Sequence, residues 1–185
     1  MKTTNVIGLC AGGHCRSLLA ALAAMKVPVL GLLDDRRRET VDGVRVIGPL
    51  SKLATLGRGR YFVGLGARDA ADCDLRRMIW NLPKGHWQPL TIIHPSAVID
   101  PKGFVAPGAQ ILALAHVGPG ATVERNAVVN TLANIEHWAR VGSHAFVGPG
   151  AILCGGAEVD IEAFVGAGAV ILPGIRVGAG ATVGA

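Results

Sequence analysis

The stretch ARVGSHAFVGPGAILCGGAEV, residues 139–159, repeats one pattern every six residues: an alanine, a variable residue, and then a valine or leucine. The aliphatic slot recurs every six residues from Ile93 to Val183, and no polar residue occupies it in that range. From Ala97 onward a small residue stands two positions before each slot, and only Ile175 departs from that rule. The register contains no insertion, so the second half of the chain is one continuous repeat.

A period of six matches neither the 3.6-residue period of an α-helix nor the two-residue alternation of one long strand. It fits short strands joined by tight corners, which is the sequence signature of a β-helix. Pairs such as Pro119-Gly120 and Pro149-Gly150 punctuate the repeat as corners require. Each buried aliphatic side chain contributes roughly 1.5 to 3 kcal/mol, so this half can fold without an aromatic core. We predict a parallel β-helix of hexapeptide repeats over residues 91–185.

The first 90 residues have a different pattern, in which apolar strands and helices alternate as in a βαβ unit. The predicted elements are strands at 5–9, 29–33 and 61–65, a tight loop at 11–14, and helices at 16–25 and 69–81. We therefore predict a small Rossmann-like α/β domain over residues 1–90, with the boundary near Pro89.

The loop after the first predicted strand reads GLCAGGHCR, residues 8–16. Gly12 and Gly13 permit close backbone approach, and the N-terminus of the following helix favours an anion. The loop is not a GxGxxG motif and the domain is roughly half of a full dinucleotide-binding domain, which disfavours a nicotinamide-dependent oxidoreductase. Asp34 and Asp35 follow the second strand, where a carboxylate either hydrogen-bonds a ribose or base or belongs to a solvated turn.

The composition narrows the class of protein. The chain has 185 residues, 4% of them aromatic, and a net charge of +5, which suits an anionic ligand but forms no basic stripe for nucleic acid. The four cysteines lack CxxC spacing, which favours a reducing compartment and argues against structural zinc. No apolar run is long enough for a signal peptide or a bilayer span. We expect a cytoplasmic protein that needs no metal and binds neither nucleic acid nor membrane.

Four motifs together resemble one family: GGH after the first strand, LLDD after the second, IIHPSAVI at the junction, and NTLANIEHWARVG, residues 130–142, in the repeat. They resemble the NeuD-type sialic acid O-acetyltransferases, a family that includes N-acetyltransferases for nucleotide-linked 4-amino sugars. The resemblance covers nearly the whole chain. It implies a left-handed β-helix, a homotrimer that binds the acyl donor in grooves between subunits, and transfer of acetyl from the cosubstrate acetyl-CoA to a sugar amine or hydroxyl.

The resemblance also implies site residues. The family's base, a histidine in an EH pair after NT, falls on His137, and the family's backbone donor to the oxyanion falls on Gly155. The histidine of GGH, which contacts the nucleotide sugar in relatives, is His14. A neutral imidazole with a pKa near 6.5 can accept the proton as an amine or hydroxyl attacks the thioester. Without this context, His137 is an exposed polar residue on a coil and His14 a local helix-start hydrogen bond.

Two positions depart from the family pattern. The residue after the catalytic histidine is usually acidic, but here it is Trp138, and Phe146 stands where many relatives place a second histidine. His144 lies two residues too early for that role, which we do not assign to it. Glu136 is an alternative partner for His137, although neighbours on a strand point to opposite faces unless a corner intervenes. Trp138 either stacks on a ligand ring or packs against a neighbouring subunit.

These observations lead to two hypotheses. The first is an acetyl-CoA-dependent acetyltransferase that acts on a nucleotide-activated amino sugar or a related sugar acid in surface polysaccharide synthesis. The alternative, motivated by Trp138 and Phe146, is a non-catalytic sugar-nucleotide-binding trimer descended from such enzymes. Because the repeat stops at Ala185 in mid-coil, we also expect a terminal tail that is missing here or supplied differently.

Overall fold

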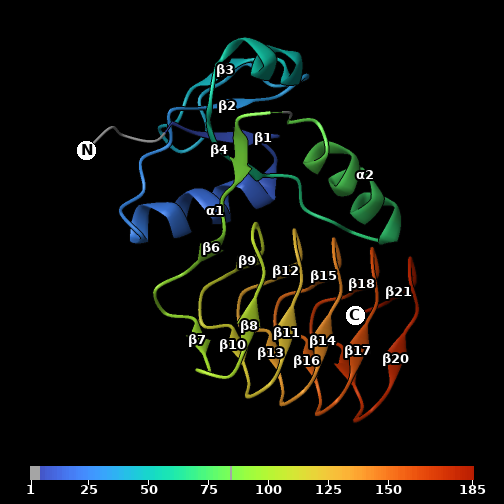
Figure 1. Cartoon of the computed structure of the whole chain (residues 1–185). Coiled ribbons are helices and arrows are strands. Elements are labelled where there is room, and N and C mark those ends of the chain that lie inside the picture. The colour runs from blue at the N-terminus through green and yellow to red at the C-terminus, as the bar shows by residue number, and fades with distance from the viewer. Residues whose placement is uncertain (1–4, 84) are drawn as a thin grey trace.

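The computed structural model describes residues 5–83 and 85–185, which form two stacked parts (Figure 1). The N-terminal part is an α/β unit, and the C-terminal part is a prism of short strands wound coil upon coil. The α/β unit lies along one long side of the prism, with α1 and α2 nearest to it (Figure 1).

A five-stranded parallel sheet in the order β3-β2-β1-β4-β5 forms the frame of the α/β unit. Helix α1 covers one face, where Leu18 and Leu22 pack against Phe62. The other face is covered by α2 and the 3-10 helix η1, which place Ile79 and Leu53 against the sheet. The elements are β1 Val6–Leu9, α1 Gly13–Ala24, β2 Gly31–Leu33, β3 Val46–Gly48, η1 Leu50–Thr55, β4 Gly59–Val63, α2 Ala70–Trp80 and β5 Trp87–Pro89.

The prism has three sides, and each side is a parallel sheet of two-residue strands. Side one consists of β6 Ile92–Ile93, β9 Gln110–Ile111, β12 Val128–Val129, β15 Phe146–Val147, β18 Phe164–Val165 and β21 Thr182–Val183. Side two consists of β7 Val98–Ile99, β10 His116–Val117, β13 Asn134–Ile135, β16 Ile152–Leu153 and β19 Val170–Ile171. Side three consists of β8 Phe104–Val105, β11 Thr122–Val123, β14 Arg140–Val141, β17 Glu158–Val159 and β20 Arg176–Val177.

The interior of the prism is filled by the repeat that the sequence shows. One core cluster contains the alanine and aliphatic slots from Ala109 to Val177, and most of these side chains are fully buried. Each coil adds one aliphatic and one alanine slot per side, so the layers stack without an aromatic residue. The prediction of a β-helix built from hexapeptide repeats is confirmed.

Helix α2 lies along one corner of the prism. The residues Gly108, Asn126, His144 and Glu162 occupy the same place in successive coils, between side three and side one, with φ between 53° and 77°; we call this the α2 corner. Trp80 lies so close over Gly108 that a Cβ there would stand 2.0 Å from its ring. Arg77 pairs with Glu162 at 2.6 Å. Helix α2 is therefore fixed against particular coils of the prism.

Arg76 is the most unexpected residue of this contact, because it is fully buried with no carboxylate bonded to its guanidinium. The guanidinium donates to the carbonyl oxygen of Leu65 and, at 3.3 Å, to Oδ1 of Asn126. Its Nε has no hydrogen-bond partner among the described residues. Burial lowers the pKa of Arg76 to about 10, and the side chain joins α2, the β4–α2 loop and the prism.

The α/β unit differs from the sequence expectation in several places. Helix α1 begins at Gly13, inside the loop predicted over 11–14, and the strands predicted at 29–33 and 61–65 are found at Gly31–Leu33 and Gly59–Val63. The elements β3, η1 and β5 occupy regions for which no element was predicted. The helix predicted over 69–81 is found as α2, with the Asp69 carboxylate accepting a hydrogen bond from the Asp72 amide at 3.0 Å. The chain leaves the five-stranded sheet after Pro89 and enters side one at Ile92.

Candidate active site

A cavity of about 660 Å³ lies where the β1–α1 loop meets the prism. Its lining includes the predicted Gly12, Gly13 and His14, together with Asn130 and Thr131 of the NT motif. A Cβ placed on either glycine would meet nothing within 4 Å, so packing in the protein does not require glycine there. The space is left open at the N-terminus of α1, which is the end that favours an anion.

His14 is held firmly at the edge of this cavity. Its Nε2 lies 2.9 Å from Oε1 of Gln110, whose Nε2 donates to the Val63 carbonyl oxygen at 2.9 Å. Because that amide oxygen can only accept, Nε2 of His14 carries a hydrogen and Nδ1 is left for another partner. Burial, together with the charge of Arg76, lowers the pKa of His14 to about 4, so the imidazole is neutral near pH 7. Its ring also meets Phe146 edge-on at 5.7 Å.

The two predicted aspartates behave differently. Both carboxylate oxygens of Asp34 accept hydrogen bonds at 2.8 Å from backbone amides, one from Ala11 and the other from Arg36 and Arg37. Burial alone would raise the pKa of Asp34, but these amides hold it below its ordinary value. Asp35 uses only Oδ1, which accepts from the Leu50 amide at 2.9 Å. Asp34 therefore stabilises the loop, whereas Oδ2 of Asp35 accepts no hydrogen bond from the described residues.

His137 and Trp138 form the turn between side two and side three, which we call the histidine corner; Pro119, Gly120, Gly155 and Gly156 lie in the same corner of adjoining coils. The His137 ring lies against Gly155, where an added Cβ would be 2.4 Å from Nε2. The Trp138 ring lies against Gly120, where a Cβ would be 2.3 Å from the indole. Both rings therefore need a glycine in an adjoining coil, Gly155 in the following coil and Gly120 in the preceding one, and the His137 ring is set directly beside the Gly155 backbone.

The Gly155 N–H is a free donor at this corner, because it has no hydrogen-bond acceptor among the described residues. The neighbouring N–H of Gly156 is already used and donates to the His137 carbonyl oxygen at 2.9 Å. An imidazole and an unused amide donor thus stand side by side. This is the pairing that attack on a carbonyl requires, a base for the nucleophile and a donor for the oxyanion.

Glu136 proves to be the acidic neighbour of His137. The corner begins at His137, so the two side chains turn to the same side, and Oε2 of Glu136 lies 3.6 Å from Nδ1 of His137. Trp138 instead meets the imidazole edge-on, with ring centroids 5.5 Å apart, and is 74% exposed. Glu136, which precedes His137, thus supplies the acidic partner that Trp138, which follows it, cannot supply.

The predicted site residues do not all meet in one chain. Thr131, in the cavity with His14, lies at the turn between side one and side two, the cavity corner, whereas His137 lies at the histidine corner. The two residues belong to the same coil, but the full width of side two separates them. His14 and His137 therefore lie on different edges of the prism.

Two further residues at motif positions, Phe146 and His144, pack against other aromatic rings. Phe146, which lines the cavity, stacks on Phe164 at 5.7 Å. His144 is buried in the α2 corner, 2.9 Å from Asn126 and edge-on to Trp80, and does not line the cavity. Sequence reasoning did not single out Asn130 and Thr131 as lining residues, although the NT pair itself was the available signal.

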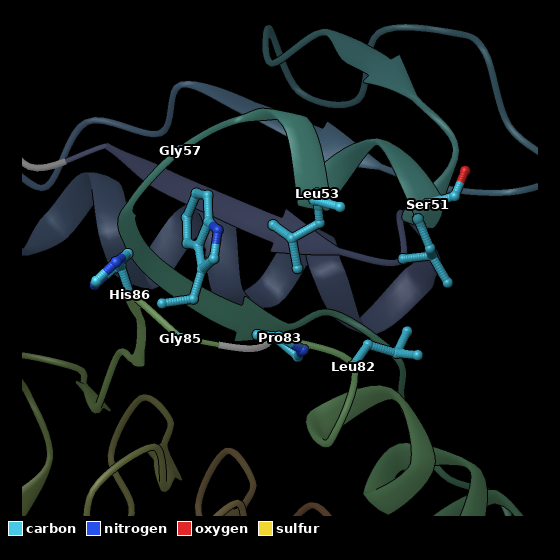
Figure 2. A pocket seen from close by; sticks show the side chains of 10 residues that line it. Ser51, Leu53, Gly57, Leu82, Pro83, Gly85 and His86 are labelled. Carbon is cyan, nitrogen blue, oxygen red and sulfur yellow. The ribbon is translucent and has the colours of Figure 1, made fainter.

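A second cavity, of about 570 Å³, lies between η1 and the segment that follows α2 (Figure 2). Leu53, Leu82 and Pro83 give it a mainly apolar wall, and His86 stands at one end (Figure 2). It contains none of the predicted site residues. Within residues 5–83 and 85–185, no group of three metal-ligating side chains occurs and no helix is long and apolar enough to cross a membrane.

Comparison with known proteins identifies the class. Residues 5–80 match the PglD N-terminal domain. GDP-perosamine N-acetyltransferase from Caulobacter crescentus, solved with CoA and GDP-perosamine, is 30% identical with a TM-score of 0.87, covering 98% of this chain and 86% of that one. The acetyltransferase domain of PglB from Neisseria gonorrhoeae is 25% identical with a TM-score of 0.81, covering 98% and 97%. No curated protein matches the chain in sequence.

A prism of hexapeptide coils beneath a Rossmann-like unit, with an imidazole and a free amide at one corner, defines a hexapeptide-repeat acyltransferase. The chain belongs to the family of GDP-perosamine N-acetyltransferase, the hexapeptide-repeat acetyltransferases of nucleotide-linked amino sugars. The family resemblance and the fold class, including the left-handed β-helix, are thereby confirmed.

Proposed function

We propose that the protein transfers the acetyl group of acetyl-CoA to an amine, or a hydroxyl, of a nucleotide-activated sugar or sialic-acid-like sugar, with His137 as the general base. The observation that carries the proposal is the His137 imidazole beside the unused N–H of Gly155, with the Glu136 carboxylate on its other side. Acetyl-CoA is a cosubstrate in this reaction, and the chemistry needs no metal.

The reaction follows from these groups. Nε2 of His137 accepts a proton from the sugar amine as its nitrogen attacks the thioester carbonyl. The oxyanion of the tetrahedral intermediate accepts a hydrogen bond from the Gly155 N–H. When the C–S bond breaks, the imidazolium returns the proton to the thiolate of CoA, so the products are the amide and free CoA. The Glu136 carboxylate favours the imidazolium that exists between the two steps.

The nucleotide sugar occupies the cavity at the β1–α1 loop in this proposal. Gly12 and Gly13 at the N-terminus of α1 hold its phosphates, and His14 contacts the sugar side. Oδ2 of Asp35 is the free acceptor for the ribose or base, whereas Asp34 shapes the loop. Residues 1–90 are accordingly the sugar-nucleotide-binding domain, and 91–185 are the acyltransferase domain.

A homotrimer completes the site, because one chain keeps His14 and His137 on different edges of the prism. Parallel prisms around a threefold axis bring equal heights together, and Thr131 and His137 lie in the same coil. Exposed apolar side chains at the edge and on side two, Leu114, Leu132 and Val98, are between 59% and 60% exposed in the single chain and support such packing. The cysteines are all unpaired, which suits the cytoplasm.

Thiol release from acetyl-CoA tests the proposal against a panel of UDP- and GDP-linked 4-amino sugars and free sialic acid. We expect sugar-dependent release that falls about 10²- to 10⁴-fold in His137→Ala. The matched control is His86→Ala, which changes an exposed histidine in the second cavity. Equal rates for His137→Ala and the native protein would refute the assignment of the base.

One observation favours a second candidate, a non-catalytic sugar-nucleotide-binding trimer. Phe146, at the place of the family's second histidine, packs on His14 and gives the cavity an apolar wall. That candidate predicts that calorimetry detects binding of a nucleotide sugar while no sugar in the panel releases CoA. Any turnover that depends on His137 removes it.

A further inference from the structure

A line of polar side chains runs across side two and ends at His137. His116 on β10 pairs in register with Asn134 on β13, and Nδ1 of His116 lies 2.8 Å from Oδ1 of Asn134. Nδ2 of Asn134 donates to Oε1 of Glu136 at 2.8 Å. The other oxygen, Oε2, faces Nδ1 of His137 at 3.6 Å. Four side chains from two adjacent coils are thus connected.

The direction of each hydrogen bond in this line is determined by what each group can do. The Glu136 carboxylate can only accept, so the Asn134 amide must turn its nitrogen toward it and its oxygen toward His116. That oxygen also only accepts, so Nδ1 of His116 carries a hydrogen. At the other end, a carboxylate beside Nδ1 of His137 favours the hydrogen on Nδ1 and leaves Nε2 unprotonated. Nε2 is the atom that lies against Gly155.

The anchoring matters because Glu136 is otherwise free to move. Its side chain is 39% exposed in the single chain, and a glutamate has several rotatable bonds whose restriction costs free energy. Asn134 fixes the carboxylate from the strand side, and its hydrogen bond is the largest of the effects that lower the pKa of Glu136. His116 fixes the Asn134 amide in turn. A base oriented by a second group, which is itself oriented, follows the general logic of catalytic triads.

We propose that Asn134 and His116 are positioning residues that hold Glu136 against Nδ1 of His137, so that the base presents an unprotonated Nε2 beside Gly155. This inference rests on the proposed function for its consequence in catalysis, and on geometry alone for its effect on His137. Neither residue touches substrate, and both act through Glu136.

Kinetics provide the first test. Asn134→Ala should lower kcat about tenfold with little change in the KM for acetyl-CoA, because positioning of the base is lost and binding is kept. His116→Ala should do the same more weakly, and His116→Gln, which keeps a donor, should restore most of the rate. Thr122→Ala, an outward residue of β11 on side three, is the control.

The tautomer of His137 tests the same inference without any turnover. In protein labelled with ¹⁵N at histidine, the Nδ1 and Nε2 resonances of His137 report which nitrogen carries the hydrogen, and they are assigned from their loss in His137→Gln. We expect the hydrogen of the neutral ring to lie on Nδ1 in the native protein and to be shared between Nδ1 and Nε2 in Glu136→Gln and in Asn134→Ala. The tautomer should stay unchanged in Thr122→Ala.

The outcomes separate the two proposals. A native protein without thiol release whose His137 tautomer still changes in Asn134→Ala contradicts the proposed function and supports the positioning role of Asn134. A native enzyme whose kcat and His137 tautomer are the same in Asn134→Ala and His116→Ala overturns the positioning role and retains the function.

Discussion

His14 and His137 lie on different edges of one prism, with the whole of side two between them. If each site takes His14 from one subunit and His137 from its neighbour, two inactive variants should complement each other in a mixed trimer. Mixing His14→Ala with His137→Ala under conditions that exchange subunits should restore up to about one quarter of the native rate by random pairing. Thiol release after co-refolding measures this. Activity that stays at the level of the separate variants would place both histidines in a single-chain site.

The contact between His137 and Gly155 makes a second prediction. An added Cβ at position 155 would stand 2.4 Å from Nε2, so Gly155→Ala should displace the imidazole and lower kcat at least tenfold. The backbone there is not left-handed, so the prism should still fold. Gly178→Ala, where the Cβ meets nothing within 4 Å, is the control for stability and rate. A kcat that Gly155→Ala leaves unchanged would show that the ring position is not critical.

Glu136, rather than the residue at position 138, should be the residue that supports the base His137. Glu136→Gln should lower kcat about tenfold or more, since a neutral amide no longer favours the imidazolium. Trp138→Ala should retain catalysis within about tenfold, because the indole touches only the edge of the His137 ring. The two variants are compared by kcat at saturating acetyl-CoA. The reverse order would assign the supporting role to Trp138.

Substitution of Asp34 should lower the stability of the fold, whereas substitution of Asp35 should weaken the binding of the nucleotide sugar. Asp34→Asn places an NH₂ group against amides that now donate to a carboxylate, which should cost about 2 kcal/mol in the free energy of unfolding. Asp35→Asn should leave stability nearly unchanged and weaken nucleotide-sugar binding. Urea unfolding and calorimetric titration measure the two effects. A loss of binding in Asp34→Asn without destabilisation would contradict this division.

Stability should fall in mild acid because of two buried histidines. Burial, with nearby arginines, lowers the pKa of both His14 and His144 to about 4, against about 6.5 in the unfolded chain. Between these values the unfolded chain binds more protons, so the free energy of unfolding decreases as pH falls from about 6.5 to about 4. His144→Asn, which suits the left-handed backbone at φ 64°, should reduce this slope. Urea midpoints from pH 7 to pH 4.5 test it, and an unchanged slope would contradict it.

The prism was predictable because its pattern is enforced by packing at every coil. An alanine and an aliphatic residue must face inward at fixed positions, so residues such as Ala145 and Val147 reveal the fold without any knowledge of their partners. The α2 contact was not predictable for the opposite reason. Arg76 reads as a solvated helix residue, and only the folded chain brings Asn126, 50 positions away, within 3.3 Å of it.

The chemistry of the site was only partly readable for the same reason. The motifs pointed to His137 and Gly155, and the structure adds that they are adjacent. Whether Glu136 could serve as partner depended on where the coil turns, which a strand pattern does not specify. Asp34 and Asp35 are chemically alike in the sequence, and their difference arises from three backbone amides that converge only in the folded loop.

The contact at the α2 corner fixes the height of each coil relative to the α/β unit. Each coil takes 18 residues, as the pairing of His116 with Asn134 shows, and adds about 4.8 Å along the axis. Because α2 packs against particular coils, the height of His137 relative to the nucleotide loop changes in steps of one whole coil and not continuously. Inserting or deleting one complete coil would move the base by one such step relative to the nucleotide loop, while every inward slot remained filled.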